Sequence, residues 1–198
     1  MFPWPFRSPE VLHREQSRLV IVDVQEKLVP AIADRHGVIA SARFLAEGAK
    51  LFGVPIHTTE QYPQGLGPTV PELAGFATDK PAKKRFSGVE ALGWPPAAEL
   101  TDGRHQIVLA GIEAHVCVLQ TAFDLMAMGY SVFLPVDALG SRSLFDREVA
   151  IERLRDAGAV VTTVEAALFE WCESADAAEF KTLSALLKNR TPRMGFHS

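Results

Sequence analysis

The sequence predicts an α/β protein with three layers, α-β-α, in which helices cover both faces of an open, mostly parallel sheet of six strands. Two observations support this prediction. Segments typical of strands and of helices alternate along the chain, which is the order that βαβ units require. The first strand segment, 19–24, is a run rich in Val and Ile without alternation of apolar and polar residues, a pattern typical of a strand buried on both faces.

The expected elements follow one another in a simple order. The strands are 19–24, 54–59, a weak strand at 76–79, 106–110, 131–136 and 159–163. The helices, which carry apolar residues at helical spacing, are 38–52, 116–128, 144–157, 164–171 and 175–188. Gly53 and Gly158 are typical helix stops. Residues 60–75 are expected to form a long loop with one short turn, and such loops usually serve function.

The alternation is not interrupted by a linker, an internal repeat or a low-complexity segment. One domain is therefore expected over residues 18–190. Residues 1–17 are expected to form an N-terminal arm that packs on the body or on a neighbouring subunit. Residues 191–198 are expected to form a C-terminal tail.

Composition limits the classes of function. The chain has 198 residues, a formal net charge of −4 and a pI of about 5.9, which argues against nucleic acid or an anionic membrane surface as a partner. Two cysteines argue against a disulfide framework. The sequence shows neither a secretory signal nor an apolar run long enough to span a membrane. We expect a cytoplasmic protein with a small-molecule substrate.

Polar residues gather at the predicted carboxyl ends of the strands, where ligands bind in open α/β folds. Asp23 lies at the end of the first apolar run, and Lys83 follows the weak third strand. A buried carboxylate needs a partner or a task, although Asp23 could instead cap the next helix. Lys83 belongs to the basic run 80–85 and could instead be solvated.

Cys117 is the candidate nucleophile. It lies in the first turn of a predicted helix that follows a buried strand and Gly111. Unpaired N–H groups and the positive end of the helix dipole favour the thiolate at such a position. The alternative is a small buried apolar residue, a common role for a free cysteine. A thiol, a carboxylate and an ammonium at one edge are suited to nucleophilic catalysis.

Three motifs carry a resemblance to a known family. They are Ile21-Val22-Asp23-Val24-Gln25, Lys83-Lys84-Arg85-Phe86-Ser87-Gly88, and the Gly111–Ala122 segment with its Cys117-Val118 and Thr121-Ala122 pairs. From Leu19 to about Lys188 the chain resembles the isochorismatase-like cysteine hydrolases, and most closely their isochorismatase-domain-containing branch. The resemblance implies an isochorismatase-like, Rossmann-like sheet and a homo-oligomer.

The resemblance also implies a catalytic triad. The family's Asp, Lys and Cys fall on Asp23, Lys83 and Cys117, with Lys84 as a competing assignment one position away. Cys117 would attack a carbonyl, Asp23 would act as general base and then acid, and Lys83 would orient both.

In the family a cis peptide bond precedes the nucleophile, and by position it would join Glu113 to Ala114. Its implied use is to direct the Ala114 N–H, with the Cys117 N–H, at an oxyanion. Position 114 is usually threonine in the family, so Ala114 is a departure that keeps the backbone donor.

Further departures narrow the chemistry. Nicotinamidases of this superfamily hold a metal with Asp-x-His after the second strand, where this chain has Glu60 and Tyr62, so no metal and no cofactor is expected. Isochorismatases proper replace the cysteine with glycine, so Cys117 argues against their reaction. We expect hydrolysis of a C–N bond in a small amide or carbamoyl compound. Candidate substrate-pocket residues are Gln25, Glu60, Gln61, Tyr62, Phe86 and His115. His115 could instead cap the helix or face solvent.

Other functions stay open. A catalytically silent oligomeric scaffold of the same fold would carry an inert thiol of ordinary pKa. A thiol-redox role would need Cys172, in a predicted C-terminal helix, as the resolving partner. A nucleotide-dependent dehydrogenase is disfavoured, because the sequence has neither Gly-x-Gly-x-x-Gly nor a Walker loop.

Overall fold

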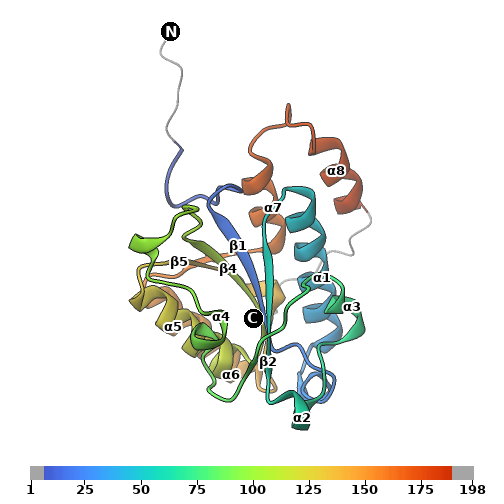
Figure 1. The fold of residues 1–198 in the computed structure, drawn as a ribbon. Coiled ribbons are helices and arrows are strands. Elements are labelled where there is room, and N and C mark those ends of the chain that lie inside the picture. The colour runs from blue at the N-terminus through green and yellow to red at the C-terminus, as the bar shows by residue number, and fades with distance from the viewer. Residues whose placement is uncertain (1–6, 189–198) are drawn as a thin grey trace.

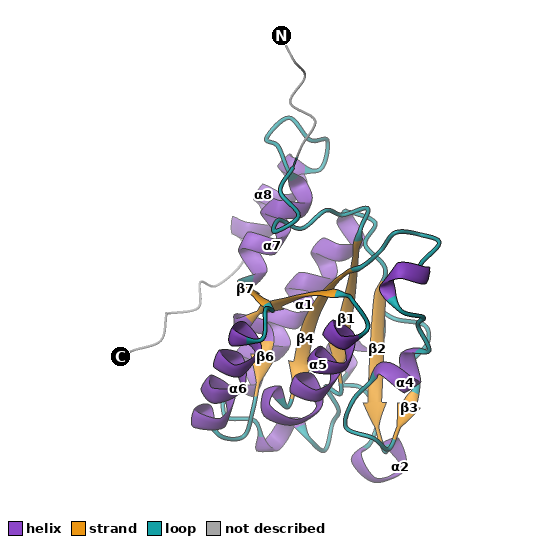
Figure 2. Cartoon of the chain, turned by 90° about the vertical axis from the view of Figure 1, so that its left-hand side faces the viewer, coloured by secondary structure: helices purple, strands orange, loops and turns teal. Residues whose placement is uncertain are grey.

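The computed structural model describes residues 7–188, in which seven strands form one sheet (Figures 1 and 2). The strands are β1 (Ser17–Val22), β2 (Ile56–Gln61), β3 (Ala82–Lys83), β4 (Gln106–Ile112), β5 (Ser131–Pro135), β6 (Leu139–Gly140) and β7 (Val160–Thr162). Their order is β3-β2-β1-β4-β5-β7, with β6 paired to β4, and these pairings are parallel. The mostly parallel α/β fold is confirmed, although the sheet has seven strands and not six.

The predicted helices correspond to the five longest helices of the structure. These are α1 (Arg35–Leu51), α5 (Leu119–Ala127), α6 (Leu144–Asp156), α7 (Val164–Cys172) and α8 (Phe180–Lys188), the last of which begins later than expected. Three short helices are α2 (Pro63–Leu66), α3 (Pro71–Ala74) and α4 (Val89–Leu92). The 3-10 turns are Val29–Ala31, Ala97–Glu99 and Val136–Ala138. A π-helical turn, Ala114–Val118, joins β4 to α5.

The core has two halves, one on each face of the sheet, and β1 contributes to both. Leu19 and Ile21 pack with residues of α1 and α7, whereas Val20 and Val22 pack with residues of α5 and α6. Figure 1 shows α1, α7 and α8 on one side of the sheet and α5 and α6 on the other. Because successive side chains of a strand point to opposite faces, a strand covered on both sides is apolar throughout.

Two parts of the sheet differ from the prediction. The weak strand expected at 76–79 is not a strand, because Phe76 and Ala77 pack against the core while the chain pairs with β2 further along, at β3. The additional strand β6 is two residues long, too short to show any periodic pattern in the sequence.

The 60–75 segment is more regular than the predicted loop. The strand β2 extends to Gln61, and helices α2 and α3 begin at Pro63 and Pro71. Proline is favoured at a first helical position, because its φ is already helical and its missing N–H would have no partner there. An antiparallel bridge between Gln25 and Thr69 ties this segment to the end of β1.

The N-terminal arm packs on the body where it is described. Leu12 is fully buried, and its N–H donates to Glu170 Oε2 of α7 at 2.8 Å. The Gln106 side chain accepts from His13 N at 2.7 Å and donates to the Val11 carbonyl at 3.0 Å. Arm residues 1–6 and the predicted tail 191–198 lie outside the described residues. Within 7–188, no helix has the length and apolar character that crossing a membrane requires.

Gly111 is a position where β4 has no room for a side chain. Its φ is +122°, and a Cβ there would lie 2.2 Å from the Val22 carbonyl oxygen of β1. We expect Gly111→Ala to lower the free energy of unfolding by about 4 kcal/mol or to prevent folding, as measured by urea denaturation. In the control Gly53→Ala, where φ is +68° and nothing lies within 4 Å, only backbone strain of about 1 kcal/mol is expected. Similar losses in both variants would contradict this explanation.

Candidate active site

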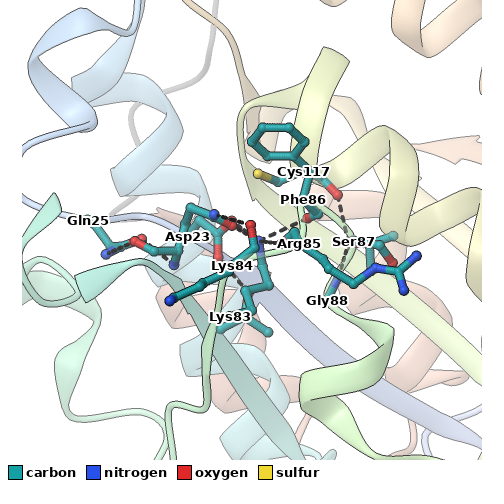
Figure 3. Close-up of polar contacts among 12 residues, drawn as sticks. Asp23, Gln25, Lys83, Lys84, Arg85, Phe86, Ser87, Gly88 and Cys117 are labelled. Carbon is teal, nitrogen blue, oxygen red and sulfur yellow. Dashed lines mark hydrogen bonds and ion pairs between the residues drawn. The ribbon is translucent and has the colours of Figure 1, made fainter. Parts of the chain in front are cut away.

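The carboxyl ends of β1, β3 and β4 bring the predicted triad together (Figure 3). Asp23 directly follows β1, Lys83 is the last residue of β3, and Cys117 lies in the π-helical turn after β4. These strands run parallel within the order β3-β2-β1-β4, so their ends lie along the same edge of the sheet. This is the edge at which open α/β folds bind ligands.

Asp23 turns the chain out of the sheet. Its φ of +52° lies in the left-handed region, which Asp adopts more readily than most residues. The carboxylate is fully buried, and Oδ1 accepts from Thr59 Oγ1 at 2.8 Å while Oδ2 accepts from Lys83 Nζ at 2.6 Å. The helix-cap alternative is wrong, because Asp34 caps α1 by accepting from the Gly37 N–H.

The ammonium of Lys83 is buried and surrounded by oxygen atoms. The acceptors of Nζ are Asp23 Oδ2 at 2.6 Å, Gln61 Oε1 at 2.7 Å and the carbonyl oxygens of Phe86 at 2.9 Å and Arg85 at 3.3 Å. The alternative of a solvated side chain is therefore wrong for Lys83 and applies to its neighbour Lys84, which is exposed. Position thus distinguishes the two lysines of the motif, and Lys83 is the partner of Asp23.

The surroundings of Cys117 favour its neutral thiol over the thiolate. Burial raises its pKa most, and the Asp23 carboxylate raises it further, against the opposing effect of the Lys83 ammonium, so that the pKa of Cys117 reaches about 12. Burial and Asp23 therefore act against the thiolate, which the position of Cys117 at the helix start was expected to favour. Desolvation and a neighbouring carboxylate both disfavour a second negative charge.

Thr121 fixes the turn that carries Cys117. Its Oγ1 donates to the Cys117 carbonyl at 2.6 Å and accepts from the Gly88 N–H at 2.8 Å. The loop before Gly88 also supplies two of the acceptors of Lys83. The Thr121 hydroxyl therefore links the turn that carries Cys117 (Ala114–Val118, the nucleophile turn) to the loop that follows Lys83 (residues 84–88, the lysine loop). Thr121 belongs to the third motif, which was the signal for it in the sequence.

The cis peptide bond lies one position earlier than predicted. It joins Ile112 to Glu113, and not Glu113 to Ala114. The strand β4 continues through Ile112 and the helical turn begins at Ala114, so Glu113 alone connects the two.

The predicted oxyanion donors lie at the start of this turn. The Glu113 carbonyl accepts from the N–H groups of Val116 at 3.0 Å and Val118 at 3.2 Å. The N–H groups of Ala114 and Cys117 take no part in these two bonds. The first N–H groups of a helical segment have no partner within it, so donors at this place are suited to an anion.

Glu113 and His115, on either side of Ala114, are held by Arg142 and Ser141, which the sequence analysis did not identify. The buried Glu113 pairs with Arg142 at 2.5 Å, and the His115 ring Nδ1 lies 3.0 Å from Ser141 Oγ. Burial opposes the ionisation of Glu113, but hydrogen bonds from Arg142 outweigh it, so the pKa of Glu113 is lowered. No local pattern predicts these contacts, because the partners come from two separate segments, one after β4 and one after β6.

Two of the candidate pocket residues hold the 60–75 segment in place. The Gln25 amide donates to the carbonyls of Gln61 at 3.0 Å and Gly67 at 2.6 Å, and accepts from the Gln61 N–H at 2.7 Å. Glu60 Oε1 accepts from both the N–H and the hydroxyl of Thr69, at 2.8 and 2.7 Å. Gln61 itself bonds Lys83 through Oε1 and the Lys84 carbonyl through Nε2.

The other candidates lie nearer the surface. Tyr62 and Phe86 are about half exposed, at 49% and 51%, and His115 is partly buried beside Ser141. Phe86 also borders an open cavity of about 370 Å³ between the lysine loop and α5. The residues that line it are Arg85, Phe86, Ser87, Gln120, Phe123 and Asp124.

Neither a metal site nor a disulfide is formed by the described residues. They contain no group of three or more His, Cys, Asp or Glu placed to hold a metal ion. His57, which precedes the position of the nicotinamidase metal motif, packs edge-on against Trp94 with ring centroids 4.9 Å apart. Cys117 and Cys172 are free and belong to the core halves on opposite faces of the sheet. A disulfide between them would need a large rearrangement, which argues against the thiol-redox role.

The chain is similar to several known proteins. The isochorismatase domain model matches residues 17–166. Isochorismatase domain-containing protein 2A of Mus musculus is 41% identical, over 93% of this chain and 88% of that protein. The solved structure of MAR1 ribonuclease from Caenorhabditis elegans has a TM-score of 0.84 and 36% identity, over 95% of this chain and 97% of that one. The YcaC gene product of Escherichia coli, an octameric hydrolase of unknown specificity, has a TM-score of 0.78 and 25% identity, over 91% and 92%.

The charges around Cys117 predict opposite effects of two substitutions on its alkylation by iodoacetamide. Asp23→Asn removes a charge that raises the pKa of the thiol, so this pKa should fall and alkylation at mildly alkaline pH should become faster. Lys83→Met removes the charge that lowers the pKa, so alkylation should become slower. In the wild type the rate should still rise with pH above the free-thiol pKa of about 8.5.

Peptide mass spectrometry against time and pH measures this rate for each cysteine. Cys172 serves as the internal control, because neither Asp23 nor Lys83 contributes to the shift of its pKa. Changes of the same sign in both variants would contradict the electrostatic explanation.

Proposed function

The chain belongs to the isochorismatase family, and we propose that it is a cysteine-dependent hydrolase that cleaves a C–N bond of a small amide or carbamoyl compound. The observation that carries the proposal is the convergence of three groups. Lys83 Nζ lies 2.6 Å from Asp23 Oδ2, and both residues are close enough to Cys117 to shift the pKa of its thiol. A nucleophile next to a base that is itself oriented by a third group is the general pattern of covalent catalysis.

In the first half-reaction Cys117 Sγ attacks the substrate carbonyl carbon while its proton passes to an Asp23 carboxylate oxygen. A thiol with a pKa of about 12 is a poor nucleophile by itself, so proton transfer has to accompany attack. The N–H groups of Ala114 and Cys117 bind the oxyanion of the tetrahedral intermediate. Collapse breaks the C–N bond, and Asp23 gives its proton to the leaving nitrogen, which leaves a thioester on Cys117.

In the second half-reaction water attacks the thioester carbon and gives a proton to Asp23. The C–S bond breaks, the acid or carbamate product leaves, and the proton returns from Asp23 to the Cys117 sulfur. Throughout, the Lys83 ammonium keeps the Asp23 carboxylate oriented through the 2.6 Å bond. Its other acceptors fix its own position, so Lys83 acts through Asp23 and through charge.

The remaining candidate residues divide by their contacts. Tyr62 and Phe86, which are half exposed, are proposed to contact the substrate, as is the partly buried His115. Gln25, Glu60 and Gln61 are proposed to shape the pocket by holding its walls, since their polar atoms already bond backbone groups or Lys83. No metal or cofactor has a role in this mechanism.

The setting proposed for this activity is a cytoplasmic homo-oligomer, folded as one domain over residues 18–190. The octameric state of the Escherichia coli relative supports the oligomer. Two free cysteines are in keeping with a reducing compartment. No membrane or nucleic-acid partner is proposed.

A second candidate reaction, hydrolysis of RNA, comes from the name of the Caenorhabditis elegans relative. The formal net charge of −4 argues against it, because proteins that bind a polyanion usually present a basic surface. An RNA oligonucleotide therefore belongs in the substrate screen as the competing case.

A screen of small primary amides and carbamoyl compounds tests the proposal through release of ammonia or amine. We expect Cys117→Ala to abolish turnover and the thioester mass on the protein. Asp23→Asn should lower kcat by roughly 100- to 10,000-fold, the usual range for loss of a general base. Cys172→Ala, a buried cysteine from the other half of the core, is the matched control and should retain the rate.

The outcomes separate the alternatives. Turnover that survives Cys117→Ala would overturn the cysteine mechanism, and cleavage of the RNA alone would favour the second candidate. Neither turnover nor a covalent intermediate with any compound would favour the silent scaffold.

A further inference from the structure

The segment after β6 contacts the start of the nucleophile turn through two side chains, those of Ser141 and Arg142. Ser141 and Arg142 are consecutive residues, and their partners His115 and Glu113 lie on either side of Ala114. Ala114 is the residue whose N–H is proposed to bind the oxyanion. Its flanking residues are therefore both tied to one short piece of chain, which the strand pairing of β6 with β4 places next to the turn.

Arg142 binds both carboxylate oxygens of Glu113 through its guanidinium and backbone N–H groups, a contact that we call the fork. Arg142 Nε lies 3.1 and 3.0 Å from the two carboxylate oxygens of Glu113, Nη2 lies 2.5 Å from Oε1, and the Arg142 backbone N–H donates to Oε2 at 3.0 Å. The Glu113 side chain is 7% exposed, whereas that of Arg142 is 63% exposed. Exposed ion pairs usually contribute little, but a buried carboxylate that loses its partner is strongly destabilised.

We propose that Arg142 and Ser141 are positioning residues that hold the Ala114 N–H in the direction required by the oxyanion. This inference rests on the proposed function. The peptide that carries this N–H runs from Glu113 to Ala114, so fixing the side chain of Glu113 on one side and that of His115 on the other restricts its rotation. Donors to an oxyanion act through a preorganised direction, and small displacements lower the rate markedly.

Two reactions of the same sulfur separate this role from a general structural one. Acylation of Cys117 by p-nitrophenyl acetate passes through a tetrahedral oxyanion, whereas alkylation by iodoacetamide displaces iodide at a saturated carbon and forms no oxyanion. The pKa shift of Cys117 comes from burial, Asp23 and Lys83, and substitution of Arg142 changes neither of these charged residues. Loss of the fork should therefore slow acylation and leave alkylation unchanged.

The expected results are specific to each variant. Arg142→Gln should slow the p-nitrophenolate burst by about 10- to 100-fold, part of the loss seen when an oxyanion donor is removed entirely. Ser141→Ala should slow it less, because one neutral hydrogen bond is lost. The double variant Glu113→Gln with Arg142→Gln replaces the ion pair by two amides, and should recover most of the acylation rate. Cys117→Ala provides the blank for both reagents.

Arg43→Gln is the matched control. Arg43 is similarly exposed, at 57%, and pairs with Glu47 at 2.9 Å on α1, outside the site. It should change neither rate. Equal slowing of acylation and alkylation in Arg142→Gln, or no slowing of acylation, would overturn the inference while the proposed function stands. A wild type whose Cys117 is alkylated but never acylated would overturn the proposed function, and this inference with it.

Discussion

The buried ion pair between Lys83 and Asp23 is the interaction on which the rest of the site depends. Their side chains are 3% and 0% exposed, and either charge alone would be costly to remove from water. The pair is stable in the interior because its other hydrogen-bonding positions are also filled, by Thr59 on the carboxylate and by Gln61 and two carbonyls on the ammonium. Removing one partner of such a pair typically costs about 3–5 kcal/mol.

The architecture around this pair follows from it. The edge strand β3 has only two residues, and one of them is Lys83, so the ion pair holds this short strand and the loop after it against the sheet. That loop reaches Thr121 through the Gly88 N–H, and Thr121 holds the Cys117 carbonyl. The carboxylate that anchors β3 also adds to the effect of burial in raising the pKa of the Cys117 thiol, and it is the group proposed to accept the thiol proton.

The candidate site residues that could be predicted from the sequence are those that end apolar runs or lie in motifs. Asp23, Lys83 and Cys117 were identified in this way, since parallel strands deliver their carboxyl ends to one edge. The rise in the pKa of Cys117 could not be predicted from local sequence, because it depends on burial and on the balance between two charges from other strands. Arg142 was missed because an exposed arginine has no distinctive pattern, and its partner is 29 residues away. The two-residue strands β3 and β6 were misplaced or missed for want of any periodicity.

The central claim, that Cys117 rests as a neutral thiol poised beside the Asp23 carboxylate, is tested most directly by the infrared S–H stretch at neutral pH. The difference spectrum between wild type and Cys117→Ala should contain an S–H band that is shifted by hydrogen bonding to the carboxylate. In Asp23→Asn this band should change position, because the acceptor becomes a neutral amide. A difference spectrum without any S–H band, together with thiolate absorbance in the ultraviolet that disappears in Cys117→Ala, would contradict the claim.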